Sequence, residues 1–257
     1  LSNGHYIPCF GLTGPNNGSD ATGEIDKGIV KKIDGKTIIE VNINKRYITL
    51  APISNLIGLA FKLEDPDNIL DSKKNGITLA LIENTHPGLI KKTYHNPLNT
   101  GFPNGTLKGN INIELDQIIG GEEKIGDGWK MLMECLAAGR GICLPATALA
   151  SSKVSTYGIL NYAKHRKQFN LPLIEMQGVQ EKFIDRLYNT WLIQCSVDLT
   201  NCILDTGEKP AVISAIMKQQ TTDRARDVIN YGMDIHAGSS ICLGDNNFLE
   251  KFYRSAP

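Results

Sequence analysis

The chain has 257 residues, of which 41% are hydrophobic and 21% are charged, as in an ordinary globular protein. Its 27 basic and 27 acidic residues balance, which argues against a nucleic-acid-binding protein. No apolar run approaches the roughly 20 residues that span a bilayer, and residues 1–8 do not resemble a signal peptide.

The cysteines show neither a CxxC pair nor the Cys/His spacing of a zinc finger. We therefore expect no disulfide framework and no metal site. Cysteines without a disulfide framework indicate a reducing compartment, so we expect a cytoplasmic protein. Peripheral association with a membrane is left open. The six cysteines are Cys9, Cys135, Cys143, Cys195, Cys202 and Cys242.

The first distinctive element is the loop 11–20, in which turn-forming residues are mixed with two hydroxyls and a carboxylate. Such a stretch exposes backbone N–H groups, which suit a ligand with carbonyls, ring nitrogens or phosphates. A polar surface turn is the alternative.

Short alternating runs follow, at residues 37–43, 56–63, 77–82 and 110–115. Asp34-Gly35 before the first of them is a hairpin signal. Strands at this spacing predict an antiparallel sandwich or barrel over residues 1–120.

From residue 121 the periodicity becomes helical, and four long helices predict an antiparallel four-helix bundle over residues 121–257. The expected fold class is therefore α+β. The second helix is expected over 145–165. The predicted core positions are Trp129, Leu132, Met133 and Leu136 in the first helix, Val179, Phe183, Leu187, Trp191, Cys195 and Cys202 in the third, and Val212, Ile216, Met217, Val228 and Ile229 in the fourth.

Four segments in order resemble the acyl-CoA dehydrogenase family. They are Leu12-Thr13-Gly14-Pro15-Asn16-Asn17-Gly18-Ser19-Asp20, the segment 44–50 around Tyr47-Ile48-Thr49, the segment 119–129 followed by Gly139-Arg140, and Tyr162-Ala163-Lys164-His165-Arg166-Lys167-Gln168-Phe169. The stretches 45–52, 207–211 and 246–249 resemble in particular the bacterial branch that begins fatty-acid β-oxidation.

The resemblance implies FAD bound between the β domain and the bundle, and a fatty acyl-CoA oxidised to the trans-2-enoyl-CoA. It implies an electron-transfer flavoprotein as acceptor and a homo-oligomer, at least a dimer. The flavin supplies the redox chemistry, and the protein supplies orientation and electrostatics. An acyl-CoA oxidase, or a non-catalytic fold relative or assembly subunit, are the alternatives.

The resemblance also assigns site residues. Cofactor contacts are expected from Leu12, Thr13, Gly18, Ser19, Tyr47, Thr49, Arg166, Gln168, Phe169 and Gly238, and substrate contacts from Ser19 and Arg140. Arg166 and its neighbours would reach the FAD of an adjacent subunit, Arg166 through phosphate. A solvated basic run, a plain strand residue at Thr49 and a half-buried barrel aromatic at Tyr47 are the alternatives.

The sequence departs from the family pattern at Gly14, where most members have Glu, and at Asp234, where they have Gln. Asp234 could only accept hydrogen bonds and would repel phosphate, and His236 is expected to be a packing residue. Gly139 excludes the minority position of the catalytic carboxylate. We therefore expect the base beyond Pro257, in a chain that lacks the family's N-terminal helical domain and C-terminal end.

Overall fold

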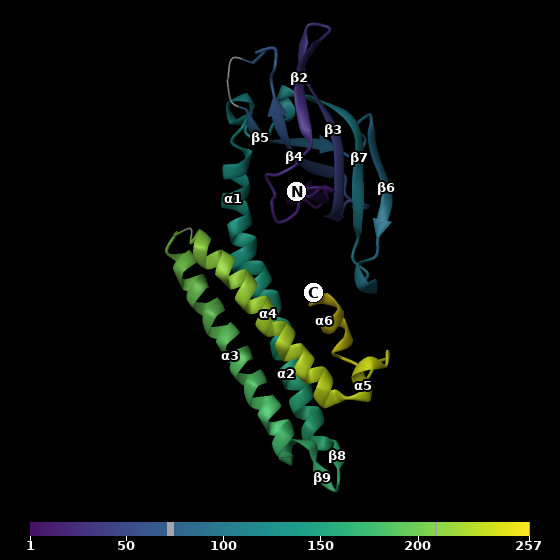
Figure 1. The fold of residues 1–257 in the computed structure, drawn as a ribbon, viewed down its shortest axis with the longest axis vertical. Helices are drawn as coiled ribbons and strands as arrows, with labels where there is room; N and C mark the ends of the chain where they lie inside the picture. Colours follow the sequence, from purple (N-terminus) through teal and green to yellow (C-terminus); the bar gives the residue numbers. More distant parts are fainter. Residues whose placement is uncertain (71–74, 209, 257) are drawn as a thin grey trace. The chain divides into compact units, whose positions relative to one another are not determined.

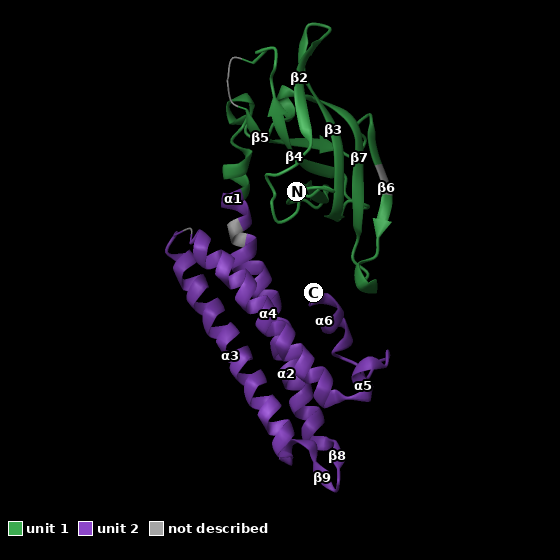
Figure 2. Cartoon of the chain, viewed as in Figure 1, with its two compact units in different colours: residues 1–132 green, residues 133–257 purple. Residues whose placement is uncertain are grey.

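The computed structural model describes residues 1–70, 75–208 and 210–256. The chain divides into two compact units, Leu1–Leu132 and Met133–Pro257 (Figure 2). The division lies inside a helix, later than the 120/121 boundary that the sequence suggests.

The first unit is built on one mixed, curled sheet (Figure 1). The strands run in the order β1-β4-β2-β3-β7-β6, with β5 paired to β4. Their bounds are β1 Pro8–Gly11, β2 Lys27–Ile33, β3 Lys36–Thr49, β4 Leu56–Glu64, β5 Gly76–Glu83, β6 Leu89–His95 and β7 Asn104–Glu114.

The predicted strands and hairpin are confirmed, but the purely antiparallel arrangement is wrong. Asp34 and Gly35 join β2 to β3 with φ of 52° and 79°, as a two-residue hairpin turn requires. Strand β4 pairs in parallel with both β1 and β2. Alternation predicts strands but not their direction, because parallel and antiparallel neighbours bury the same face.

The core of this unit lies on the side-chain face that β3, β4 and β7 share. Val41, Ile57, Phe61, Leu107 and Ile111 are fully buried there. From Ile39 onward strand β3 buries every second residue, and after Val41 and Ile43 the next buried position on this face is a lysine, Lys45. That lysine starts the site described below.

The second unit is helical. The helices are α1 Gly128–Ala138, which crosses the division, α2 Leu144–His165, α3 Gln177–Asp205, α4 Ala211–His236, α5 Gly238–Ile241 and α6 Glu250–Ser255, with a small hairpin of β8 Lys167–Gln168 and β9 Leu171–Pro172.

All four predicted helices exist, but the antiparallel four-helix bundle is not confirmed. Helix α1 continues through a π-helical turn, Gly139–Cys143, into α2 instead of reversing direction. Pro145 lies in the first turn of α2, where a proline is compatible with a continuing helix. Helices α2, α3 and α4 pack on one another through Leu149, Ile193, Val197 and Met217.

Several predicted core positions are exposed. Hydrophobic periodicity identifies an apolar stripe but not whether neighbours cover it, and α3 carries apolar residues on two faces. Phe183, Ile193 and Val197 are buried, whereas Trp191 is 62% exposed. The predicted core residues found exposed are Trp129, Leu136, Leu187, Trp191, Cys195, Cys202, Val212 and Ile216.

One helical stretch, Gly128–His165, meets the length and hydropathy expected of a membrane-crossing helix, with a mean hydropathy of 1.3 in its most apolar window. The sequence-based expectation that no such stretch exists is therefore not confirmed. The criterion is weak evidence for a membrane span, because core helices of soluble proteins also meet it. Ala148, Leu149, Ile159 and Ala163 of α2 are packed inside the helical unit.

Candidate functional site: a clamped loop and a polar pocket

In the first unit, a buried lysine holds the start of the loop 11–20. Lys45 on β3 is completely buried, and its Nζ donates to the carbonyl of Leu12 at 3.2 Å. The same ammonium lies 3.1 Å from Asp26 Oδ2, which also accepts from the backbone N–H of Asn44 at 3.0 Å. Burial lowers the pKa of Lys45, and the neighbouring Asp26 opposes this effect. Pairing with Asp26 therefore offsets part of the cost of burying the side chain of Lys45.

The loop places Thr13 directly beside β3. Arg46 N–H donates to the Thr13 carbonyl at 2.9 Å, one residue before Tyr47. Leu12 and Thr13 are half-buried, whereas Gly18 and Ser19 are exposed. The structure thus brings Leu12 and Thr13 to the Tyr47 segment, while the roles of Gly18 and Ser19 remain predictions.

The departure at Gly14 has a local explanation in Asn17. The Asn17 side chain is buried, and its Nδ2 donates to the Leu12 carbonyl at 3.1 Å. A Cβ on Gly14 would lie 2.6 Å from Asn17 Oδ1 and 3.1 Å from the Asn44 carbonyl. Residue 14 can carry no side chain while Asn17 fills this space.

Tyr47 presents its ring outward at an irregularity in β3. The pairing with β7 shifts register between Lys45 and Ile48, and Tyr47 adopts a left-handed φ of 62°. Such a bulge redirects a side chain. The ring is 64% exposed, and its centroid lies 5.1 Å from that of His95. The alternative of a half-buried barrel aromatic is therefore wrong.

The surroundings of Tyr47 are fixed by polar contacts. Its carbonyl accepts from Asn104 Nδ2 at 3.1 Å, and Thr49, exposed, pairs with Asn104 across the strands. His95 Nε2 lies 2.8 Å from Thr106 Oγ1. His95 lies in none of the family-like segments, so no sequence pattern predicted its contact with Tyr47.

In the second unit, Arg166 and Gly238 line one pocket of about 630 Å³. Its walls are Tyr162, Arg166 and the segments 236–239 and 242–247. Arg166 caps the end of α2 by donating its backbone N–H to the Tyr162 carbonyl at 2.8 Å. Arg166 and Gly238, far apart in sequence, thus line the same pocket, while their cofactor roles remain predictions.

Gln168 and Phe169 do not line this pocket. Phe169 and Asn170 form the turn between β8 and β9 with φ of 51° and 65°. The Phe169 ring is 91% exposed. Their cofactor roles therefore remain predictions, as does that of Arg140, half-buried in the π-helical turn.

His236 also lines the pocket. It is buried, with its ring 4.5 Å from that of Tyr162 and 5.3 Å from that of Phe248. Desolvation lowers its pKa, which favours the neutral imidazole. These contacts agree with the expected packing role.

The substitution at Asp234 is compensated by an ion pair. Asp234 Oδ2 lies 2.9 Å from Lys182 Nζ on the adjacent helix, and Asp234 does not line the pocket. Its charge is therefore balanced locally rather than directed at a ligand phosphate. Within the described ranges 1–70, 75–208 and 210–256, no three His, Cys, Asp or Glu side chains are grouped as a metal site.

We expect Lys45→Met to lower the free energy of unfolding by about 3–5 kcal/mol, because it leaves the carboxylate of Asp26 without its counter-charge and removes one of the two donors to the carbonyl of Leu12. Urea denaturation measures this loss. Lys31→Met is the matched control, since the Lys31–Glu40 pair is exposed and should be worth about 1 kcal/mol or less. Equal effects of both substitutions would contradict a clamping role for Lys45.

We expect Ala237→Gly to raise the free energy of unfolding by about 1 kcal/mol. Ala237 has φ 54° and ψ −135° at the end of α4, a region that costs a residue with a Cβ. Thermal unfolding measures the gain. The control, Ala150→Gly inside α2, should instead destabilise the protein by about 0.5–1 kcal/mol. A loss of stability in Ala237→Gly would show that this conformation is not strained.

Comparison with known proteins was made by sequence and by structure. The family model described as "Acyl-CoA dehydrogenase, C-terminal domain" matches residues 126–257, about half of the chain. Protein HemX of Proteus mirabilis is 43% identical over 108 residues, covering 40% of this chain and 64% of that protein.

The short-chain-specific acyl-CoA dehydrogenase of Megasphaera elsdenii is 29% identical over 241 residues, covering 93% of this chain and 60% of that protein. The crystal structure of an acyl-CoA dehydrogenase from Geobacillus kaustophilus superposes with a TM-score of 0.86 at 23% identity, covering 99% of this chain and 64% of that one. The chain thus spans less than two thirds of the length of these proteins. It belongs to the acyl-CoA dehydrogenase family, whose members are FAD-dependent oxidoreductases acting on CH–CH donors.

Proposed function

We propose that the protein is an FAD-dependent acyl-CoA dehydrogenase that converts a fatty acyl-CoA to the trans-2-enoyl-CoA in fatty-acid β-oxidation. It would act in the cytoplasm as a homo-oligomer and pass electrons to an electron-transfer flavoprotein. The observation that carries this proposal is the pocket shared by Arg166 and Gly238.

The pocket suits the adenosine diphosphate half of FAD. Arg166 offers an exposed, permanently charged guanidinium, which can bind pyrophosphate through two parallel hydrogen bonds. A Cβ added to Gly238 would meet no other part of the protein within 4 Å, so the space beside this residue is open to a ligand. Asp245 also lines the pocket and, as a pure acceptor, suits a ribose hydroxyl rather than phosphate.

The wall formed by Thr13, Tyr47 and Thr49 suits the isoalloxazine half. The exposed face of Tyr47 can stack on a flat ring system, and the hydroxyls of Thr13 and Thr49 can bond its polar edge. By the family resemblance, this wall and the Arg166 pocket that serve one FAD come from two subunits. The proposal therefore requires an oligomer.

FAD, when bound, supplies the acceptor for the hydride that leaves the substrate Cβ. The residues of this chain bind and orient: Arg166 and Gly238 hold the adenosine diphosphate half, and Tyr47 and Thr49 hold the ring. Ser19 and Arg140 are proposed to contact the acyl-CoA. Removal of the α-proton needs a carboxylate base, and we assign that role to no residue of this chain.

We expect Arg166→Ala to weaken FAD binding by about tenfold to a hundredfold, because charge-assisted hydrogen bonds to phosphate are lost. Quenching of flavin fluorescence measures the affinity. Lys167→Ala removes the same charge from the next residue, which does not line the pocket, and should change the affinity less than about twofold. Equal effects of the two substitutions would reduce Arg166 to a member of a solvated basic run.

We also expect the purified protein to be yellow and, in a protein that carries the carboxylate base, a fatty acyl-CoA added without oxygen to bleach the flavin absorbance. Bleaching reports hydride transfer to the flavin. Exposure of the reduced protein to oxygen then separates the alternatives, because rapid peroxide formation identifies an oxidase. A colourless protein that takes up no added FAD would overturn the proposed function.

A further inference from the structure

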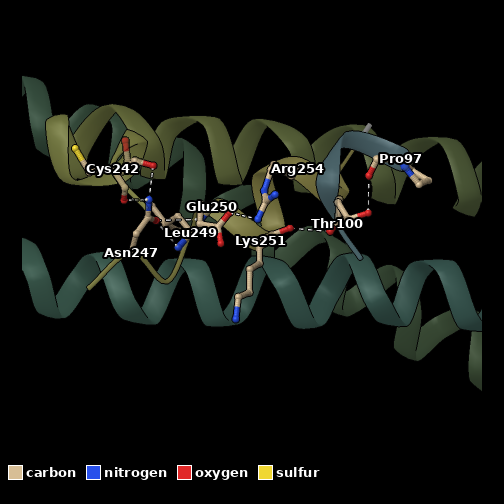
Figure 3. A network of polar contacts seen from close by, with 10 residues as sticks. Pro97, Thr100, Cys242, Asn247, Leu249, Glu250, Lys251 and Arg254 are labelled. Carbon is tan, nitrogen blue, oxygen red and sulfur yellow. Dashed lines mark hydrogen bonds and ion pairs between the residues drawn. The ribbon is translucent and has the colours of Figure 1, made fainter. Parts of the chain in front are cut away.

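One buried side chain, Asn247, organises the far wall of the Arg166 pocket. It is 6% exposed and makes four hydrogen bonds, drawn in Figure 3. Its Nδ2 donates to the carbonyls of Ser240 at 2.6 Å and Cys242 at 3.0 Å. Its Oδ1 accepts from the backbone N–H groups of Leu249 at 3.1 Å and Glu250 at 3.0 Å.

The oxygen and the nitrogen of the Asn247 amide bind different segments of the chain. The oxygen satisfies N–H groups at the start of α6, as a helix-capping side chain does. The nitrogen reaches back to α5, so that residues 242–246 form a closed loop between the two contacts. Those five residues all line the pocket.

The closed loop is also tied to the end of α4. Ser240 Oγ donates to the carbonyls of Ala237 at 2.6 Å and Met233 at 3.1 Å. Ala237 and Gly238 line the same pocket. Asn247 therefore completes a chain of hydrogen bonds from α4 through α5 to α6, and this chain links the segments that line the pocket.

We propose that Asn247 is a positioning residue for the cofactor: by donating to Ser240 and Cys242 it holds residues 242–246 in the shape that binds the adenosine diphosphate half of FAD. The inference rests on the proposed function and gives a role to Asn247, a residue of the family-like stretch 246–249 to which the resemblance assigned no contact. Because a pocket held open in advance costs less ordering on binding, the amide acts on affinity without touching the ligand's charge.

Asn247→Asp removes the donating nitrogen of the amide and so tests its hydrogen bonds separately from those of the oxygen. The shape is unchanged and both capping contacts are kept, but a carboxylate cannot donate to the two carbonyls. Asn246→Asp is the matched control, since it adds the same charge to the neighbouring residue of the pocket, which is exposed. The two variants add the same formal charge, buried at residue 247 and exposed at residue 246, and only Asn247→Asp loses the two donated hydrogen bonds.

The measurement is the affinity of each purified variant for FAD and for FMN, which lacks the adenosine portion. For Asn247→Asp we expect the ratio of FAD to FMN affinity to fall about tenfold, against about twofold for Asn246→Asp. A general loss of folding would lower both affinities together and leave the ratio unchanged. Equal ratios in the two variants would overturn the proposal.

Asn247→Ser covers the case in which Asn247→Asp does not fold. Serine still caps α6 but is too short to bridge to Ser240 and Cys242, so the same fall in the ratio is expected. A ratio equal to that of the unsubstituted protein would refute the positioning role. Failure of the unsubstituted protein to bind FAD at all would instead refute the proposed function, so the two failures are distinguishable.

Discussion

The site in the first unit depends on the contacts that the buried Lys45 makes with Asp26 and Leu12. A lysine at a core position of β3 is tolerated only because Asp26 balances its charge and the Leu12 carbonyl accepts a hydrogen bond from its Nζ. The contacts that stabilise the buried ammonium also fix the position of the loop. Since Arg46 also bonds Thr13, the loop cannot move away from Tyr47 without exposing the pair to water or leaving it unpartnered.

In the second unit, polar backbone groups beside the pocket are paired by neutral side chains instead of charged ones. Its pocket lies where α4 ends in the strained conformation of Ala237, and where the chain must turn twice before α6. Four carbonyls and two N–H groups in these turns are satisfied by the side chains of Ser240 and Asn247. Because each of these polar groups is paired inside the protein, the pocket wall is rigid while its surface stays polar.

Local patterns predicted local structure well and long-range placement poorly. Asp34-Gly35 predicted its hairpin because two left-handed residues are intrinsic to that turn. The apolar stripe on α3 predicted that Trp191 is buried, but Trp191 is exposed, since periodicity does not say which face the neighbouring helices cover. Motif residues Arg166 and Gly238 were found together, whereas Lys45 and Asn247 were missed as site determinants. A buried lysine and a buried asparagine have no composition signal; only their partners, distant in sequence, explain them.

The two departures from the family pattern bear on whether the chain is a non-catalytic relative. At Gly14 the missing side chain leaves room that Asn17 fills while bonding Leu12. At Asp234 the added charge is paired with Lys182 and kept away from the pocket. Each departure is thus accommodated by a neighbouring side chain, and Asp234 does not line the Arg166 pocket. Neither departure therefore conflicts with the cofactor contacts that the proposed function requires.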